Sequence, residues 1–124
     1  MITRIKSNHI IADTELVSGY VYFDNGRITH ITAQDLPYDT EYDYTGYYVS
    51  PGFIDIHSHG GMGHEFFGSS EDIVEACNFH LSHGTTSICP TISAAPFDIM
   101  KNSVAEAKKA MSDSRLKEIG RAHV

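Results

Sequence analysis

The sequence predicts an α/β fold in which a β-rich segment precedes the first strand–helix units of a parallel sheet. Residues 1–50 contain short apolar and aromatic runs separated by turn residues, which is typical of β-strands. After Pro51, β-branched runs alternate with stretches of helical spacing, which is the rhythm of βαβ units. The remaining 124 − 50 = 74 residues hold about two to three units, since a complete eight-unit barrel takes roughly 250 residues.

Short strands are predicted for the first part of the chain. Isoleucines at both ends of residues 2–5 and throughout residues 10–11 predict a first pair of strands. Residues 19–23 and 27–31 predict a hairpin, because the sequence Asp24-Asn25-Gly26 between them tolerates the positive φ values that tight hairpin turns require.

The segment beyond residue 68 predicts a helix and then a second strand. Ser69 or Ser70 supplies an N-cap hydroxyl, and Asp72 follows in the first turn. Apolar residues then recur at helical spacing as far as Gly84, which is a typical C-terminal stop. Residues 85–89 are rich in β-branched side chains and predict the strand.

A second helix is predicted to open at Pro96 and to end at Gly120. Its apolar residues step by three and four, so we expect them to share one face and to pack in the core. These residues are Phe97, Met100, Val104, Ala107 and Met111. Residues 122–124 are expected to begin a third strand.

Two histidines follow the first strand after Pro51. Residues 53–57 are predicted to form this strand, and because side chains alternate along a strand, His57 and His59 point to the same side. Neutral imidazole nitrogens are good metal ligands, and α/β enzymes place their chemistry at the carboxyl ends of parallel strands. We therefore predict that this pair binds one metal ion, with Gly60-Gly61 allowing the backbone to pass close to it.

The composition argues against several kinds of partner. The net charge is −7, with 16 acidic and 9 basic residues, which disfavours nucleic acid, and no apolar run approaches the roughly 20 residues that span a bilayer. We interpret the tyrosines around Thr45-Gly46 as half-buried strand residues and not as a platform for nucleic-acid bases. No apolar signal core follows the N-terminus, and Cys77 and Cys89 are too few for a disulfide framework. We therefore expect a cytoplasmic protein with reduced thiols, no nucleic acid and no membrane.

Residues 51–59, Pro-Gly-Phe-Ile-Asp-Ile-His-Ser-His, resemble the motif at the first barrel strand of the amidohydrolase superfamily. Residues 60–63, Gly-Gly-Met-Gly, and 83–87, His-Gly-Thr-Thr-Ser, are similar to segments of the N-acetylglucosamine-6-phosphate deacetylase family within it. The resemblance implies a metal-dependent (β/α)8 barrel preceded by a small β-sandwich domain. Residues 1–50 would be the N-terminal part of the sandwich domain, and residues 51–124 the start of a truncated, incomplete barrel.

The resemblance also implies an activity, which is hydrolysis of the acetamide of N-acetylglucosamine 6-phosphate to glucosamine 6-phosphate and acetate. It implies one or two divalent ions, zinc or iron, held in part by His57 and His59. The family takes its other ligands, a Glu, two His and an Asp, from later strands, and the general base is expected beyond residue 124. We therefore expect the fragment itself to be inactive. The full-length protein is expected to be a homodimer that acts on an amino-sugar phosphate.

Two other functions stay open. The first is another amidohydrolase, either a cyclic amidase or a nucleobase deaminase. Dihydroorotases are disfavoured, because residues 60–65 lack the Arg that these enzymes use for a substrate carboxylate. The second is a truncated, non-catalytic binding or assembly module, in which open strand edges and apolar faces capture a partner.

Roles are also predicted for five other side chains, and two of them, Asp55 and His64, have two interpretations each. Asp55 shares the face of the two histidines and either orients them or serves as a buried, hydrogen-bonded structural carboxylate, which we favour. His64 is a candidate substrate-binding residue, and an exposed loop residue is the alternative. His80 and His83 are expected on the first helix, away from the site. Cys89 is expected to be a small core residue.

Overall fold

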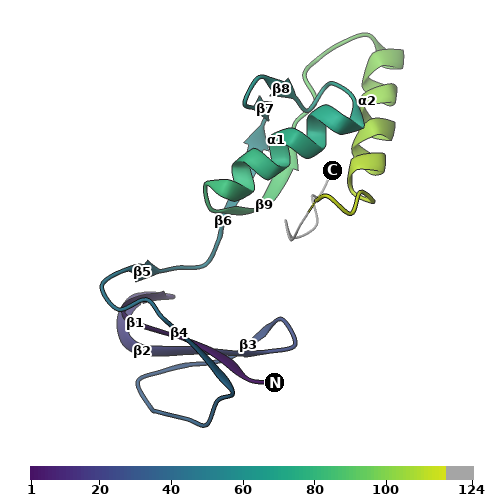
Figure 1. Ribbon diagram of the computed structural model, residues 1–124. Coiled ribbons are helices and arrows are strands. Elements are labelled where there is room, and N and C mark those ends of the chain that lie inside the picture. Colours follow the sequence, from purple (N-terminus) through teal and green to yellow (C-terminus); the bar gives the residue numbers. More distant parts are fainter. Residues whose placement is uncertain (117–124) are drawn as a thin grey trace. The chain divides into compact units, whose positions relative to one another are not determined.

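The computed structural model describes residues 1–116 and divides into two compact units, Met1–Pro51 and Gly52–Val124 (Figure 1). The first unit is a β-sheet, and the second is built from strands and helices. No helix within the described part of the chain is long and apolar enough to cross a membrane. The strand predicted at residues 122–124 lies outside the described residues.

The first unit is a single sheet made of β1 (Thr3–Ala12), β2 (Glu15–Asp24), β3 (Arg27–Thr32), β4 (Thr40–Asp43) and β5 (Tyr48–Val49). Its order is β3-β2-β1-β4, and β5 also pairs with β1. β1 runs antiparallel to β2 and parallel to β4 and β5. The predicted hairpin is confirmed, because Asn25 and Gly26, with φ of 49° and 73°, connect β2 to β3. A single sheet is one layer, so the β-sandwich stays a prediction.

The prediction of two separate strands before this hairpin is wrong. Residues 3–5 and 10–11 both belong to β1, and β2 pairs with this strand from Thr3 to Ala12, with a register shift between Ser7 and Ile10. The Ser7 hydroxyl satisfies the backbone at this irregularity, since it donates to the Tyr47 carbonyl at 2.6 Å and accepts from the His9 amide at 3.0 Å. The polar residues between the two runs therefore mark a bulge in one strand.

The prediction of half-buried tyrosines is also wrong for the segment that follows β3. The Tyr47 and Tyr48 side chains are 69% and 67% exposed, and those of Tyr42 and Tyr44 are exposed as well. These residues lie on or beside β4 and β5, which pair only with β1 among the described strands. One sheet leaves its outer strands without a covering layer within residues 1–51, so the rings stay at the surface.

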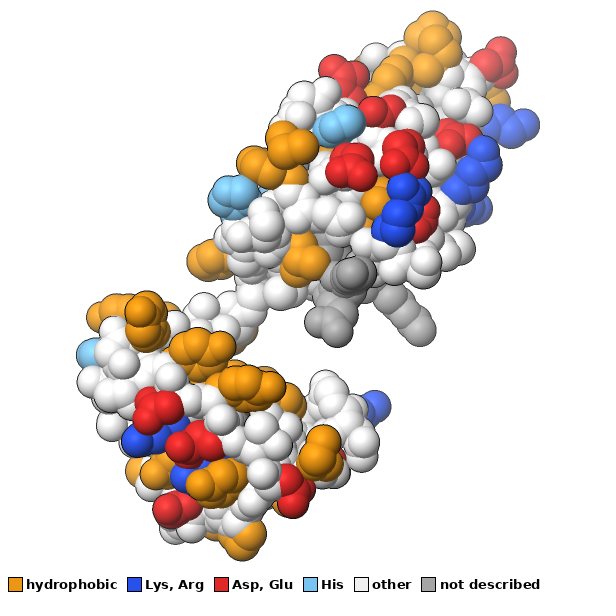
Figure 2. All heavy atoms as spheres, viewed as in Figure 1, with side chains coloured by type: hydrophobic (Ala, Val, Ile, Leu, Met, Phe, Trp, Pro, Cys, Tyr) orange, Lys and Arg blue, Asp and Glu red, His pale blue; other side chains and the backbone are white. Residues whose placement is uncertain are grey.

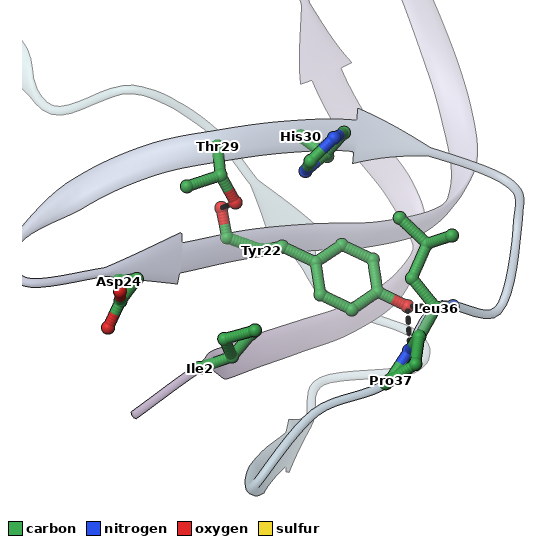
Figure 3. Close-up of a pocket in the computed structure, with 7 residues that line it drawn as sticks. All are labelled: Ile2, Tyr22, Asp24, Thr29, His30, Leu36 and Pro37. Atoms are coloured by element: carbon green, nitrogen blue, oxygen red, sulfur yellow. Dashed lines mark hydrogen bonds between the residues drawn. The ribbon is translucent and has the colours of Figure 1, made fainter.

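Tyr22 on β2 organises the long connection between β3 and β4 (Figure 3). Its buried hydroxyl accepts hydrogen bonds from the Leu36 amide at 2.8 Å and from Arg4 Nη1 at 3.1 Å, and the Gln34 carbonyl lies 3.3 Å away. The Arg4 guanidinium, in turn, lies 3.6 Å from the ring centre of Tyr38. The Tyr22 hydroxyl therefore joins β2 to the connection between β3 and β4.

Tyr22→Phe is expected to lower the free energy of unfolding by about 1–3 kcal/mol, because it leaves the half-buried Leu36 amide without its acceptor and removes a buried hydroxyl that accepts from Arg4. Tyr47→Phe removes an exposed hydroxyl from the same unit and should change the free energy by no more than about 0.5 kcal/mol. Denaturant unfolding of the two variants measures the difference. Equal effects would show that the Tyr22 hydroxyl does not support this connection.

The second unit contains β6 (Phe53–Ser58), β7 (Gly60–Gly61), β8 (His64–Glu65), α1 (Ser70–Ser82), β9 (Thr85–Pro90) and α2 (Phe97–Ala110). β6 and β9 are parallel neighbours joined through α1, so the expected βαβ unit is present, and α2 completes a second βα unit. β7 and β8 form a small antiparallel hairpin directly after β6. The core lies where α1 meets β9 and α2, and its buried members are Phe66, Ile73, Val74, Ala76, Cys77, Ile88, Ala107 and Ala110.

Both ends of α1 match the sequence prediction. Ser69 is the N-cap, its hydroxyl accepts from the Asp72 amide at 3.2 Å, and the Asp72 carboxylate accepts from the Ser69 amide at 3.0 Å, which completes a capping box. Beyond the helix, Gly84 has φ +94° and donates to the Leu81 carbonyl at 3.0 Å.

Two predictions for α2 are wrong. The helix ends at Ala110 and not at Gly120, because the Asp113 side chain accepts from the Arg115 amide at 2.9 Å and closes a turn. The buried face consists of Ser103, Ala107 and Ala110, so the predicted core position of Ala107 is confirmed and those of Phe97 and Met111 are wrong. Phe97 is 74% exposed. Small residues bring α2 close to its neighbours, and Figure 2 shows hydrophobic side chains left at the surface of this unit.

Candidate metal site

The two predicted ligands meet at the carboxyl end of β6. The Nε2 atoms of His57 and His59 lie 3.3 Å apart, and their ring centres are 5.2 Å apart. His57 is on the strand and His59 follows it, so the spacing of two residues places both rings on one side. The His57 side chain is exposed, which leaves the paired nitrogens accessible from that side.

The separation of the two nitrogens suits a shared divalent ion. Imidazole nitrogens bind zinc at about 2.0–2.1 Å, and two such bonds at a tetrahedral angle place the nitrogens about 3.3 Å apart. The observed 3.3 Å agrees with this value. Two nitrogens fill only part of a coordination sphere of four or more, and within residues 1–116 no group of three or more His, Cys, Asp or Glu side chains could hold a metal. The described residues therefore supply a pair of ligands and not a complete site.

Neighbouring polar groups contact the side chain of His59 and the backbone of His57. Ser93, in the loop after β9, places its hydroxyl 3.2 Å from His59 Nδ1, where it can accept the Nδ1 proton and leave the Nε2 lone pair for a metal. The Asp55 carboxylate accepts from the His57 backbone amide at 3.0 Å. The structure thus gives Asp55 a contact with the backbone of the strand. Ser93 had no sequence signal, because a lone serine in a loop matches no ligand spacing.

The backbone after His59 requires glycine. Gly60 has φ +154°, and a Cβ at this position would lie 2.1 Å from the His64 carbonyl oxygen of the paired strand β8. The tight β7–β8 hairpin therefore begins immediately after the second histidine.

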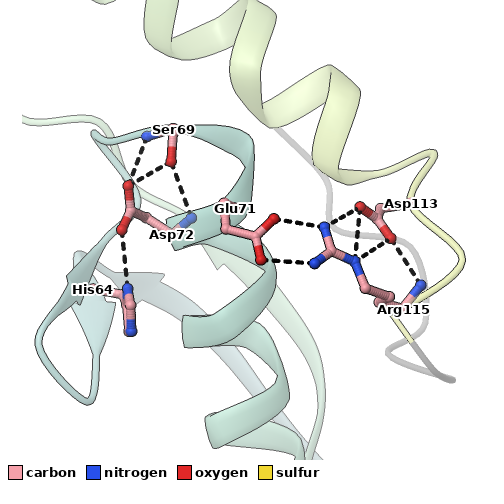
Figure 4. Close-up of polar contacts among 6 residues, drawn as sticks. All are labelled: His64, Ser69, Glu71, Asp72, Asp113 and Arg115. Atoms are coloured by element: carbon pink, nitrogen blue, oxygen red, sulfur yellow. Dashed lines mark hydrogen bonds and ion pairs between the residues drawn. The ribbon is translucent and has the colours of Figure 1, made fainter.

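His64 faces α1 (Figure 4). Its Nδ1 lies 2.9 Å from the Asp72 carboxylate, which also accepts a hydrogen bond of 2.6 Å from the Ser69 hydroxyl. The hairpin that follows the histidine pair is thereby attached to the N-cap of the helix. In the same first turn of α1, Glu71 makes a bidentate pair with Arg115 at 2.7 Å, which joins α1 to the segment after α2. Asp72 is thus a structural partner of His64, and a substrate-binding role for His64 stays a prediction.

Hydrogen bonds from His64 and Ser69 lower the pKa of Asp72 from 3.8 to about 2. Since the folded-state pKa lies below the usual value, this carboxylate stabilises the folded unit above about pH 4, and the contribution is lost as the pH falls towards 2. His64→Ala should raise the pKa of Asp72 towards its usual value. Titration of the carboxyl carbon by NMR measures this shift, and an unchanged midpoint in the variant would contradict the role of His64.

The remaining candidates lie elsewhere. His83 is the C-cap of α1, with Nδ1 2.9 Å from the Phe79 carbonyl, as expected for a residue away from the site. Cys77 is a core residue, and burial raises the pKa of its thiol to about 11, so it stays protonated. Cys89 is half-buried on β9. His80, in contrast, contacts the loop after the histidine pair, which the sequence prediction missed.

A parallel βα arrangement with two convergent imidazoles at the carboxyl end of a strand defines an α/β protein with a candidate metal site. The Amidohydrolase family profile matches residues 48–116, which include both histidines. The chain therefore belongs to the amidohydrolase family, whose members are generally metal-dependent.

Individual relatives are more specific, and they confirm the resemblance to the deacetylases. The N-acetylglucosamine-6-phosphate deacetylase of Bos taurus is 38% identical over 65 residues, which cover 49% of this chain and 16% of that protein. The enzyme of the same name from Bacillus subtilis is 29% identical over 119 residues, which cover 90% of this chain and 30% of the relative. The chain therefore spans less than a third of the length of either relative.

Solved structures share the fold. The N-acetyl-D-glucosamine-6-phosphate deacetylase of Mycobacterium smegmatis, a mutant in complex with N-acetyl-D-glucosamine-6-phosphate, superposes with a TM-score of 0.79 at 23% identity, covering 90% of this chain and 30% of that one. The corresponding enzyme from Pasteurella multocida gives 0.72 at 24% identity, covering 91% of this chain and 31% of that one. The described α/β arrangement thus matches the part of these enzymes that aligns with it.

Proposed function

We propose that this chain is the N-terminal part of a metal-dependent N-acetylglucosamine-6-phosphate deacetylase. The observation that carries the proposal is the 3.3 Å approach of His57 Nε2 to His59 Nε2 at the carboxyl end of β6, within the region that matches the amidohydrolase family. The named relatives supply the substrate, an amino-sugar phosphate with an acetamide to hydrolyse.

The chain's own residues would bind and orient the metal. His57 and His59 would hold a divalent ion through Nε2, and Ser93 would keep the proton of His59 on Nδ1. A bound divalent metal supplies a water of lowered pKa and polarises the carbonyl of the substrate. The turn at Gly60 would direct the backbone away from the two histidines immediately after His59.

Other parts of the proposal concern the complete protein. The remaining ligands and the general base would come from segments beyond the described residues, so the 124 residues alone would be inactive. Zinc or iron, as one or two ions, would be the cofactor. We also propose a cytoplasmic homodimer that binds neither nucleic acid nor membrane, in keeping with a net charge of −7.

Acetate release tests this proposal. The protein encoded by the complete reading frame should produce acetate and glucosamine 6-phosphate from N-acetylglucosamine 6-phosphate, and chelation of its metal should stop the reaction. A cyclic amide and adenine serve as competing substrates. Turnover of either in place of the sugar phosphate would overturn the proposed substrate and favour another amidohydrolase activity.

A further inference from the structure

His80 occupies the last turn of α1, beneath the hairpin that follows the histidine pair. Its half-buried ring stacks on Phe66 with ring centres 6.2 Å apart and packs edge-on against Phe79 at 5.8 Å. Two aromatic neighbours restrict the imidazole to a narrow range of orientations. The restricted orientation directs its Nε2 at the backbone of the hairpin.

His80 Nε2 lies 2.9 Å from the Gly60 carbonyl oxygen. A carbonyl only accepts hydrogen bonds, so Nε2 carries the proton and donates it. The Ser58 hydroxyl lies 3.5 Å from the same nitrogen. The imidazole also packs closely against the next residue, since a Cβ on Gly61 would lie 3.0 Å from this nitrogen.

The His80 bond acts on the backbone immediately after a proposed metal ligand. Three consecutive carbonyls at this point are each held by a different segment: Ser58 by the Thr91 amide at 2.8 Å, His59 by the Phe66 amide at 3.0 Å, and Gly60 by His80. The first two donors are backbone amides. The Gly60 carbonyl also accepts from the Ser58 hydroxyl at 3.4 Å. His80, at 2.9 Å, is the closer of its two side-chain donors, and a substitution can remove it.

We propose that His80 is a positioning residue for the metal pair, which holds the Gly60 carbonyl and so fixes the backbone that presents His59 to the metal. The inference rests on the proposed metal-binding role of His57 and His59. It assigns a function to a histidine that lies outside the ligand motif, on a helix, and touches neither ligand side chain in the described contacts.

The test measures zinc affinity of the full-length protein by competition with a chelator. His80→Leu should weaken binding about tenfold, the lower end of the range for groups that support metal ligands. His80→Gln should restore affinity to within about threefold, because the Gln Nε2 donor can occupy the place of the imidazole Nε2. His83→Leu is the matched control, since it removes an imidazole from the same end of α1, and it should leave affinity unchanged.

Thermal unfolding of the metal-free variants separates positioning from folding. A loss of affinity in His80→Leu with an unchanged Tm, and its recovery in His80→Gln, supports positioning, whereas affinity equal to that of His83→Leu overturns it. If the leucine variant does not fold, His80→Asn replaces it, since its shorter amide cannot reach Gly60 and the same loss is expected.

A wild-type protein that binds no zinc would overturn the proposed function and not the contact itself. Amide exchange at Phe66 in metal-free His80→Gln and His80→Asn then decides the contact, because only the asparagine variant should exchange faster. Equal exchange in the two variants would overturn positioning independently of metal binding.

Discussion

Replacing His57 and His59 together by alanine is expected to abolish metal binding and deacetylation by the full-length protein. Removing a group that merely supports a ligand costs about 10–100-fold in metal affinity, so loss of both ligands should exceed about a hundredfold. The fold should persist, because neither side chain belongs to the hydrophobic core. Metal content and acetate release measure the effect.

His30→Ala is the matched control for this variant. His30 is an exposed histidine on β3 of the first unit, so its loss removes one imidazole without touching the pair. It should retain full metal content and activity. A double variant that keeps its metal, or a control that loses it, would contradict the assignment of the pair.

Gly60→Ala is expected to give the largest loss of stability among single substitutions in the hairpin. The new Cβ would lie 2.1 Å from the His64 carbonyl oxygen, a backbone atom that cannot move aside without breaking the β7–β8 pairing, and φ is +154°. Strain and overpacking together should lower the free energy of unfolding by roughly 3 kcal/mol or more.

Gly63→Ala separates the steric clash from backbone strain. Gly63, in the same hairpin, has φ +82°, but a Cβ added there would meet no atom within 4 Å, so alanine should cost about 1–2 kcal/mol. Denaturant unfolding compares the two variants. A Gly60→Ala variant as stable as Gly63→Ala would show that the turn can rearrange, and the constraint on His59 would then be weaker than the geometry indicates.

Features that depend on residues close together in the sequence could be predicted. Asn25-Gly26 forms the hairpin turn, Ser69 and Asp72 form the capping box, and Gly84 follows the end of α1. Each depends on residues a few positions apart, whose backbone preferences act before any tertiary contact. The approach of His57 and His59 follows from the two-residue period of a strand in the same way.

Features set by distant packing could not be predicted. The buried face of α2 includes Ser103, whose hydroxyl lies 3.1 Å from the Ile99 carbonyl of its own helix and 3.2 Å from the Phe67 carbonyl of another segment. Helical spacing alone favoured larger apolar residues at this face. The sequence predicts His80 away from the site. Its partner is a backbone carbonyl 20 residues earlier, and every residue has such a carbonyl, so the amino-acid types do not indicate this contact. The glycine pair after His59 indicated only that another part of the chain packs closely against this backbone.

The most direct test of the metal pair is a crystal structure of the metal-loaded full-length protein, with the ion located by its anomalous scattering. We expect a metal within about 2.0–2.3 Å of Nε2 of both His57 and His59, with the Ser93 hydroxyl still beside His59 Nδ1. A metal bound elsewhere, or through only one of the two histidines, would contradict the account.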